Sequence, residues 1–392
     1  MTGGPEPRRG PILSPELAGC DPTLPPWPLC WPDVPALAPE DLFASCATTL
    51  LASEDRLLLA VSGGSDSMGL LAAAIRWDRH RVAVVHVHHG LRASADEDSR
   101  LVRDVASQLE LPFEIVNAPP SVTSDGHDSH GKTETAARER RMAALSSVAR
   151  RRAISWVATA HHREDALETM LLHMLRGHRG DRALASIPTV RKLDTDTRML
   201  RPFLFAEATG RHALSTMRTE AGLPFREDPT NRDLSIPRNA VRALLKDAQP
   251  PLDAHTLNPL RLAARKRLET RLASVASRLE TAWHLEGAGC RVDSTAWHPP
   301  EGDSQQAWVP ELLRLIGAGL DSPRVVAPRA SVVGELIRML SKGHGDLEVP
   351  ADPTPLKLRV SSSAVHFLNE RVAEIDTASR ILQSLSQTSL YV

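Results

Sequence analysis

One segment of the chain combines the residue types that bind phosphate: Ser62-Gly63-Gly64-Ser65-Asp66-Ser67. The two glycines allow a tight turn that brings backbone N–H groups close to a phosphate, and the serine hydroxyls add further donors. The N-terminus of the helix expected after this segment adds positive potential. Asp66 would repel a bare phosphate, which favours a Mg²⁺ ion between the two. The segment therefore predicts a nucleotide-phosphate site with Asp66 as the metal ligand, and an ordinary Gly-Ser turn is the alternative.

A second phosphate-binding pattern occurs further along, where Gly126 is followed by four residues and then by Gly131-Lys132-Thr133. A P-loop requires a strand that runs straight into its first glycine. Here two prolines and a polar run separate Gly126 from the apolar segment that ends near Val116. We interpret this second pattern as a chance match.

Two carboxylates, Asp165 and Glu168, follow the apolar segment Ile154–Thr159 and are three residues apart, so they share one face of a helix. Such a pair suits proton acceptance or the binding of a cationic amine, and a solvated charged face is the alternative. His161 and His162 precede the pair. Adjacent histidines point in different directions and no third ligand lies nearby, so we expect no zinc site. We assign His161 to nucleotide or substrate contact.

Apolar strand-like segments alternate with helical patterns between residues 40 and 250, which predicts an α/β fold. The expected strands are Arg56–Val61, Val82–Val87, Phe113–Val116 and Ile154–Thr159, and the expected helices are Asp41–Leu51, the segment after Ser94, Glu134–Arg150 and Leu167–Leu175. Nearly continuous apolar strands indicate a Rossmann-like parallel sheet with helices on both faces. Ligands of such sheets bind beyond the carboxyl ends of the strands, so the phosphate segment and the carboxylates should meet there.

The remaining segments suggest three regions along the chain. Residues 1–39 contain eleven prolines, which predicts an extended or disordered extension. Residues 40–250 form the expected catalytic domain. Residues 251–392 suggest a smaller, mainly helical C-terminal domain with short strands near Leu347–Val349 and Leu356–Phe367. Its first helix has a basic face between Arg261 and Arg278, which predicts either nucleic-acid contact or a solvated surface.

Composition narrows the class of protein. The 392 residues have a formal net charge of -1, and no apolar run approaches the length of a membrane span. The start of the chain lacks a signal-peptide pattern, so we expect a soluble cytoplasmic protein. The four cysteines, Cys20, Cys30, Cys46 and Cys290, form no C-x-x-C pair, which argues against a disulfide scaffold, a zinc ribbon and an iron–sulfur cluster. Arginine greatly outnumbers lysine, which suits RNA contact or reflects codon composition.

A strand followed by SGGxDS and a helix resembles the PP-loop ATP pyrophosphatases, which cleave ATP between the α- and β-phosphates and adenylate a substrate. Further segments, in order, are similar to those of the tRNA(Ile)-lysidine synthetase family. They are His88-His89-Gly90-Leu91-Arg92, the helix from Glu134 to Arg141, Ala160 to Thr169, Arg201-Pro202, Asp228-Pro229-Thr230-Asn231, and Arg238-Asn239 with Arg242. Met142, Glu164 and Ala166 stand where that family usually has Tyr, Asp and Gln, and the glycine-rich turn at 176–181 has one additional residue.

The resemblance implies a reaction and its partners. ATP, with Mg²⁺, would activate the C2 oxygen of the cytidine at the first anticodon position of a tRNA(Ile) with a CAU anticodon. The ε-amine of L-lysine would then displace AMP and give lysidine. The alternatives are a 2-thiocytidine-type tRNA enzyme, an amidotransferase of the NAD-synthetase type, and a non-catalytic tRNA-binding relative. A thiocytidine enzyme would be expected to carry paired C-x-x-C ligands.

The resemblance also assigns residue roles. Those expected to act in catalysis are Asp66, Arg138, Asp165 and Glu168, with ATP bound by Ser62, Gly63, Gly64, Ser65, Asp66 and Ser67. Those expected to contact substrate or nucleotide are His89, His161 and Arg141. Those expected to bind tRNA are Arg201, Asn231, Arg238, Asn239 and Arg242.

Overall fold

The computed structural model describes residues 39–88, 95–118, 130–194, 196–204, 210–247, 254–286, 289–319, 324–325, 330–349, 351–352 and 356–368. The proline-rich segment before residue 39 and the candidate contact residue His89 lie outside these ranges. Side chains at the start of the helix that contains Lys132 are likewise not described. Within the described residues, no helix is both long enough and apolar enough to cross a membrane.

The first part of the chain forms a six-stranded sheet in the order β3-β2-β1-β4-β6-β5. Its strands are β1 (Leu57–Ala60), β2 (Val82–His88), β3 (Phe113–Asn117), β4 (Trp156–Ala158), β5 (Val190–Lys192) and β6 (Arg198–Leu200). All neighbouring pairs are parallel except β5 and β6. The predicted Rossmann-like parallel sheet is therefore confirmed. The hydrophobic pattern did not reveal two further strands of three residues each, β6, which is parallel to β4, and β5, which is the antiparallel edge strand.

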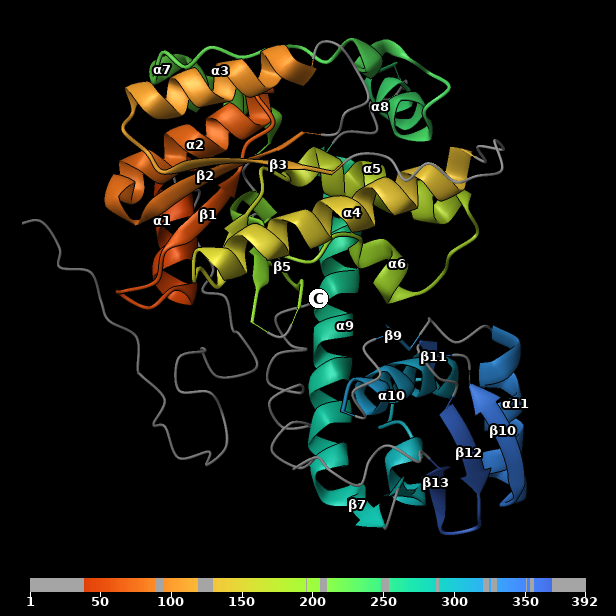
Figure 1. Cartoon of the computed structure of the whole chain (residues 1–392). Helices are drawn as coiled ribbons and strands as arrows, with labels where there is room; N and C mark the ends of the chain where they lie inside the picture. The colour runs from red at the N-terminus through yellow and green to blue at the C-terminus, as the bar shows by residue number, and fades with distance from the viewer. Residues whose placement is uncertain are drawn as a thin grey trace, which may run out of the picture.

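Helices cover both faces of this sheet (Figure 1). They are α1 (Pro39–Leu50), α2 (Ser65–Asp78), α3 (Ala95–Gln108), α4 (His130–Arg151), α5 (Arg163–Leu175), α6 (Asp181–Ala185), α7 (Arg211–Glu220) and α8 (Pro237–Asp247). On β1, Leu57 and Leu59 pack in one core with α1, α2 and α7, whereas Leu58 packs in a second core against α4. Burial on both faces explains why β1 is an uninterrupted apolar run rather than an alternating one.

The second part of the chain is more strand-rich than the mainly helical domain that we expected. It contains α9 (Ala254–Ala282), β7 (Trp283–Glu286), β8 (Gly289–Asp293), α10 (Gln305–Gly319), β9 (Arg324–Val325), α11 (Ala330–Lys342), β10 (Gly345–Val349), β11 (Ala351–Asp352), β12 (Leu356–Val360) and β13 (Ala364–Leu368). Five of these strands form an antiparallel sheet in the order β10-β12-β13-β8-β7. One face of α9, including Leu268 and Leu279, packs with this sheet and with Trp297 and Trp308 in a separate core.

The basic face of α9 is occupied by contacts within the protein. Arg261 is almost fully buried and donates to Asn258, and Arg271 bridges Asp181 of α6 and Asp303. Arg267, Arg265 and Arg278 also bond to carboxylates or backbone carbonyls. The sequence suggested an RNA surface or a solvated face here, and most of these arginines instead hold α9 to its neighbours.

Close packing of α2 against α7 fixes the helix that follows the phosphate segment. A Cβ atom added to Gly69 of α2 would lie 2.5 Å from the backbone oxygen of Leu214 in α7. Only a glycine permits this approach of the two helices. The position of α7 relative to the phosphate segment therefore depends on Gly69.

We expect Gly69→Ala to lower the free energy of unfolding by about 1–3 kcal/mol, because the added methyl group must push α7 away from α2. Gly334→Ala is the matched control, since Gly334 lies inside α11 and a Cβ there would meet no atom within 4 Å. That change should raise stability by about 0.5–1 kcal/mol through helix propensity. Chemical denaturation would measure both, and equal effects would contradict the proposed steric role.

Candidate active site

The segment between β1 and α2 forms a compact loop at the carboxyl end of the central strand. The Ser62 N–H donates to the Ser67 hydroxyl at 3.2 Å, and that hydroxyl donates to the Gly64 carbonyl at 2.9 Å. Gly63 has a φ of +90°, a conformation that favours glycine. The first backbone N–H groups of a helix have no partner inside the helix. This loop therefore offers an anion the donors predicted for a phosphate site.

The loop lies at the point where the strand order reverses. β1 pairs with β2 on one side and with β4 on the other, and α5 follows β4 just as α2 follows β1. In open α/β sheets the ligand binds in the crevice at this switch point. The sheet thus brings together two segments that are about 100 residues apart in the sequence, the phosphate loop and the N-terminus of α5.

Asp66, in the first turn of α2, has one oxygen that fits a metal-bridged phosphate. Within the described residues, Oδ1 is buried and has no hydrogen-bond partner. Oδ2 lies 3.5 Å from His162 Nε2 and 3.6 Å from Arg211 Nε. No group of three or more His, Cys, Asp or Glu side chains in the described ranges could hold a metal alone. A Mg²⁺ ion at Oδ1 would take its other ligands from phosphate and water, as it commonly does.

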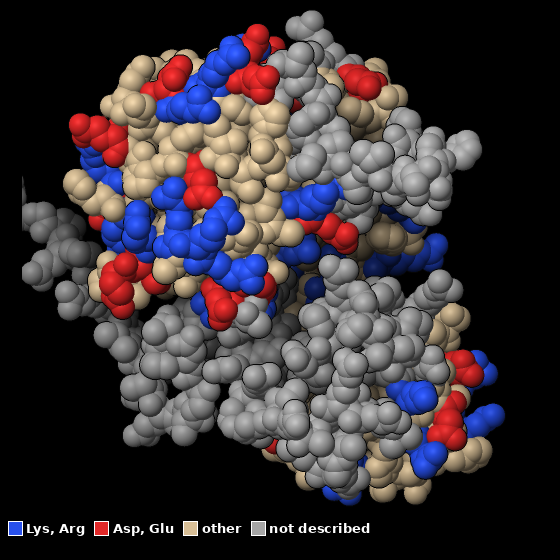
Figure 2. All heavy atoms as spheres, in the orientation of Figure 1, with Lys and Arg blue, Asp and Glu red and all other residues tan. Residues whose placement is uncertain are grey.

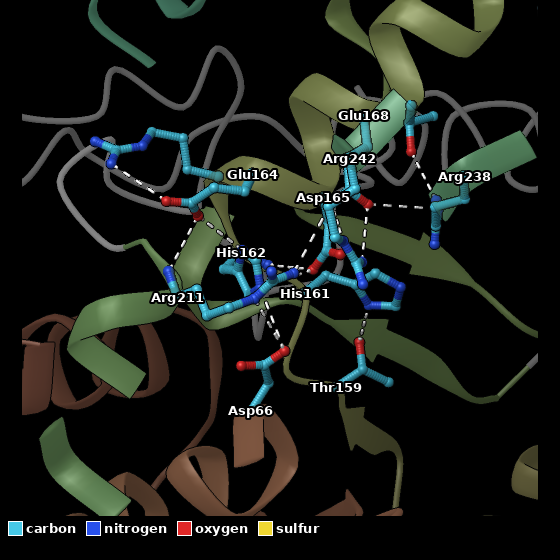
Figure 3. A network of polar contacts seen from close by, with 12 residues as sticks. Asp66, Thr159, His161, His162, Glu164, Asp165, Glu168, Arg211, Arg238 and Arg242 are labelled. Carbon is cyan, nitrogen blue, oxygen red and sulfur yellow. Dashed lines mark hydrogen bonds and ion pairs between the residues drawn. The ribbon is translucent and has the colours of Figure 1, made fainter. Parts of the chain in front are cut away.

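His162 forms the centre of the site, between the loop and α5 (Figure 3). Its side chain is fully buried. Nδ1 lies 2.8 Å from Glu164 Oε2, and Nε2 lies 3.4 Å from Asp165 Oδ2. Burial lowers the pKa of His162, but the charges of Asp165, Asp66 and Glu164 outweigh it and raise the pKa to about 9. His162 is therefore an imidazolium at neutral pH and holds three carboxylates around it.

The two histidines have opposite electrostatic roles. His161 Nδ1 is 2.8 Å from the Thr159 hydroxyl, just after β4. Desolvation and then the charge of Arg201 lower the pKa of His161, so its imidazole is neutral. Burial opposes ionisation of Asp165, yet the cation of His162 holds the pKa of Asp165 below its usual value. A neutral imidazole and an ionised carboxylate thus lie next to each other at the start of α5.

Glu168 is enclosed by arginines instead of facing a free pocket. It is 1% exposed, and it accepts two hydrogen bonds from Arg242 of α8, at 2.7 and 3.1 Å. Arg238 Nε lies 3.8 Å away, and Arg238 also donates to Thr169. Of the two carboxylates expected to bind an amine or accept a proton, Glu168 is therefore neutralised by residues of this chain.

Several expected RNA-binding residues have structural partners. Arg201 is 1% exposed and donates to the Pro188 carbonyl at 2.6 Å. Asn239 is buried and donates to the carbonyls of Thr230 and Asp233. Both side chains face inward, so neither presents its polar group to a polynucleotide. Asn231, in contrast, is exposed.

Two arginines of α4 that belong to the predicted set are exposed as well. Arg138 and Arg141 both lie on the surface, three residues apart on one helix. On the face shown in Figure 2, basic side chains are interspersed with acidic ones. At the C-terminal end of α4, Arg151 and the following Arg152 both pair with Glu114. Exposure at Arg138 and Arg141 is compatible with contact to a large anionic substrate.

Two functional candidates received no role from the sequence motifs. Arg211, the first residue of α7, reaches both Asp66 and Glu168. Glu164 accepts a hydrogen bond from the Arg211 backbone N–H at 3.0 Å. Glu164 stood out only as a departure from the family pattern, and a lone arginine after a glycine carried no signal.

Comparison with known proteins identifies relatives of this chain. A family model described as a PP-loop domain matches residues 40–248. A tRNA(Ile)-lysidine synthase from Bradyrhizobium sp. strain BTAi1 is 34% identical over 342 residues, which cover 85% of this chain and 80% of the relative. Those of Bradyrhizobium diazoefficiens and Bordetella parapertussis are 38% and 35% identical, over 55% and 57% of this chain. The matched regions span 58% and 64% of these last two relatives.

The buried imidazolium predicts a pH dependence of stability without added ATP or metal. The pKa of His162 is about 9 in the folded protein and near 6.5 when unfolded, so the folded state binds more protons between these values. Its stabilising contribution is complete below pH 6.5 and is lost as pH rises towards 9. The slope should approach about 1.4 kcal/mol per pH unit. Denaturation of His162→Gln should show little of this slope, whereas the exposed control His80→Gln should keep it. Equal slopes in both variants would contradict the assignment.

Proposed function

Because the chain belongs to the PP-loop tRNA(Ile)-lysidine synthase family, we propose that it is an enzyme that ligates L-lysine to tRNA with ATP. The acceptor is C2 of the cytidine at position 34 of a tRNA(Ile) with a CAU anticodon. The products are lysidine, AMP and pyrophosphate. The observation that carries this proposal is the contact between the phosphate loop and α5, through Asp66 and His162.

The first step is adenylation of the base. The C2 oxygen of cytidine attacks the α-phosphorus of ATP, and the bond to the bridging oxygen breaks with its electron pair leaving on pyrophosphate. Ser62 to Ser67 and the N-terminus of α2 supply donors to the phosphates. Asp66 Oδ1 would hold Mg²⁺, which neutralises phosphate charge when bound. His162 contacts Asp66 and so holds the start of α5 next to this loop.

The second step is attack by the ε-amine of lysine on C2, with AMP as the leaving group. Asp165 is the carboxylate best suited to the amine, because it is ionised and remains partly accessible. Glu168 has a different role in this scheme, since Arg242 already neutralises it. It positions Arg242 and Arg238 at the edge of the site. Burial and then the charge of Arg201 lower the pKa of His161 to about 3, so its imidazole stays neutral and serves as a hydrogen-bonding contact for the substrate beside Asp165.

The tRNA would approach the site along exposed arginines. Arg138 and Arg141 of α4 are exposed, and about a third of the Arg238 and Arg242 side chains is accessible beside Glu168. Planar guanidinium groups suit phosphates of a single-stranded anticodon loop. This assignment keeps four of the arginines suggested by the sequence and leaves Arg201 as a structural residue.

We expect Asp66→Asn to reduce AMP formation on the order of 100-fold or more, because the phosphates lose the residue that would hold their metal. The assay supplies labelled lysine, ATP and tRNA(Ile), and follows label in the tRNA together with AMP. Asp104→Asn changes an exposed carboxylate on α3 and should have wild-type activity. Near-normal AMP formation by Asp66→Asn would remove Asp66 from the reaction.

We expect Asp165→Asn to affect lysine binding and Glu168→Gln to affect stability. Asp165→Asn is expected to raise the KM for lysine by about 10-fold or more with little change in the KM for ATP, since a charge-assisted contact to the amine is lost. Glu168→Gln should chiefly lower stability by about 1–3 kcal/mol, because Arg242 loses its charged partner. Steady-state kinetics and denaturation of both variants test this. A lysine-specific effect of Glu168→Gln alone would reverse the two assignments.

A further inference from the structure

Arg211 places a cation beside the phosphate loop from a part of the chain outside the motifs. Its Nε lies 3.6 Å from Asp66 Oδ2, and one terminal nitrogen lies 3.8 Å from Glu168 Oε1. The side chain is 39% exposed. Figure 3 shows it extending between α7 and Asp66. It therefore lies at the accessible side of the loop, on the Oδ2 side of Asp66.

The backbone of Arg211 is held tightly. Its N–H donates to Glu164 Oε2 at 3.0 Å, and that carboxylate also faces His162. A Cβ on Gly210 would collide with Glu164 Oε1, so a side chain at that position would disturb this approach. With Gly69 fixing α7 against α2, the start of α7 is positioned directly next to the phosphate loop.

The guanidinium itself makes no hydrogen bond in the described part of the chain, because its two carboxylate contacts are longer than hydrogen bonds. Neighbouring arginines differ in this respect. Arg242 donates twice to Glu168, Arg238 donates to Thr169, and Arg218 donates to Ser65 and to the Leu223 carbonyl. Arg211 thus combines a fixed backbone with side-chain donors that a ligand can use.

We propose that Arg211 binds the pyrophosphate end of ATP. The proposal rests on the proposed function for the use of ATP at this loop. A guanidinium offers planar, paired donors that match phosphate oxygens, and these oxygens carry most of the charge of the nucleotide. As the α-phosphorus bond to the bridging oxygen breaks, the electron pair leaves on pyrophosphate. Arg211 stabilises that leaving group, and Glu164 acts as its positioning residue.

The location of the contact gives a specific signature. AMP lacks the β- and γ-phosphates, so Arg211 should contribute to the binding of ATP and of inorganic pyrophosphate and contribute little to AMP. A purely structural role would alter all three ligands together. The ratio of ATP affinity to AMP affinity therefore separates a phosphate contact from a disturbance of the fold.

The test is calorimetric titration of the full chain with ATP, pyrophosphate and AMP, in the absence of tRNA. Arg211→Ala should weaken ATP and pyrophosphate by about 10-fold to 100-fold and leave AMP within about twofold. Arg211→Lys retains the charge without the paired donors and should recover part of the loss. Arg76→Ala is the control: Arg76 is 37% exposed, lies on α2 and pairs with Glu220, and its loss should leave all three affinities unchanged.

Unchanged ATP affinity in Arg211→Ala overturns the proposal, as does an equal loss for ATP and AMP in both Arg211 variants. Failure of the proposed function looks different. A wild-type chain that binds ATP but transfers no lysine to tRNA(Ile) contradicts the ligase assignment, while the selective loss in Arg211→Ala would still support the phosphate contact.

Discussion

Compensation of one buried positive charge organises the site. The side chain of His162 is excluded from water, and an uncompensated ion there would cost several kcal/mol. Carboxylates reach it from the first turn of α2 and from the first turn of α5, through Asp66, Glu164 and Asp165. Since Glu164 also holds the start of α7, three helix N-termini converge on one imidazolium. The N-terminus of each helix carries a partial positive charge, so all three contribute backbone donors close to the phosphate loop.

The same compensation separates the tasks of similar residues. His162 is charged and His161 is neutral, although they are adjacent in the sequence. Glu168 is paired with an arginine, whereas Asp165 faces the imidazolium. Because their surroundings push the pKa values of the two histidines apart, a charged and a neutral imidazole coexist at one pH. The site therefore has a defined charge pattern before any substrate binds.

Much of the α/β architecture follows from local patterns. The apolar run of β1, the glycines after it and the helix from Ser65 are contiguous, so strand, loop and helix could be predicted together. The pairing of Glu168 with Arg242 joins residues that are 74 positions apart. The local sequence therefore could not show that Glu168 is paired within the protein while Asp165 is left for a ligand. For the same reason the inward direction of Arg201 and Asn239 was not predictable. The strands of the C-terminal region are short and partly polar, so their hydrophobic pattern was too weak to reveal the five-stranded sheet.

The long helix α9 has a consequence for how the two parts of the chain are oriented. Near its start, Leu257 packs with Leu167 and Met170 of α5, and from Leu268 onwards it packs in the C-terminal core. Because one continuous helix packs into both cores, it fixes their rotation relative to each other about the helix axis. Each residue of an α-helix turns the chain by about 100°. A single insertion or deletion between Leu257 and Leu268 would rotate the entire C-terminal sheet by that angle about the helix axis, and Arg271 would no longer face Asp181. Substitutions at exposed positions of this stretch do not change that rotation. The number of residues between Leu257 and Leu268 is therefore more strictly constrained than their identity.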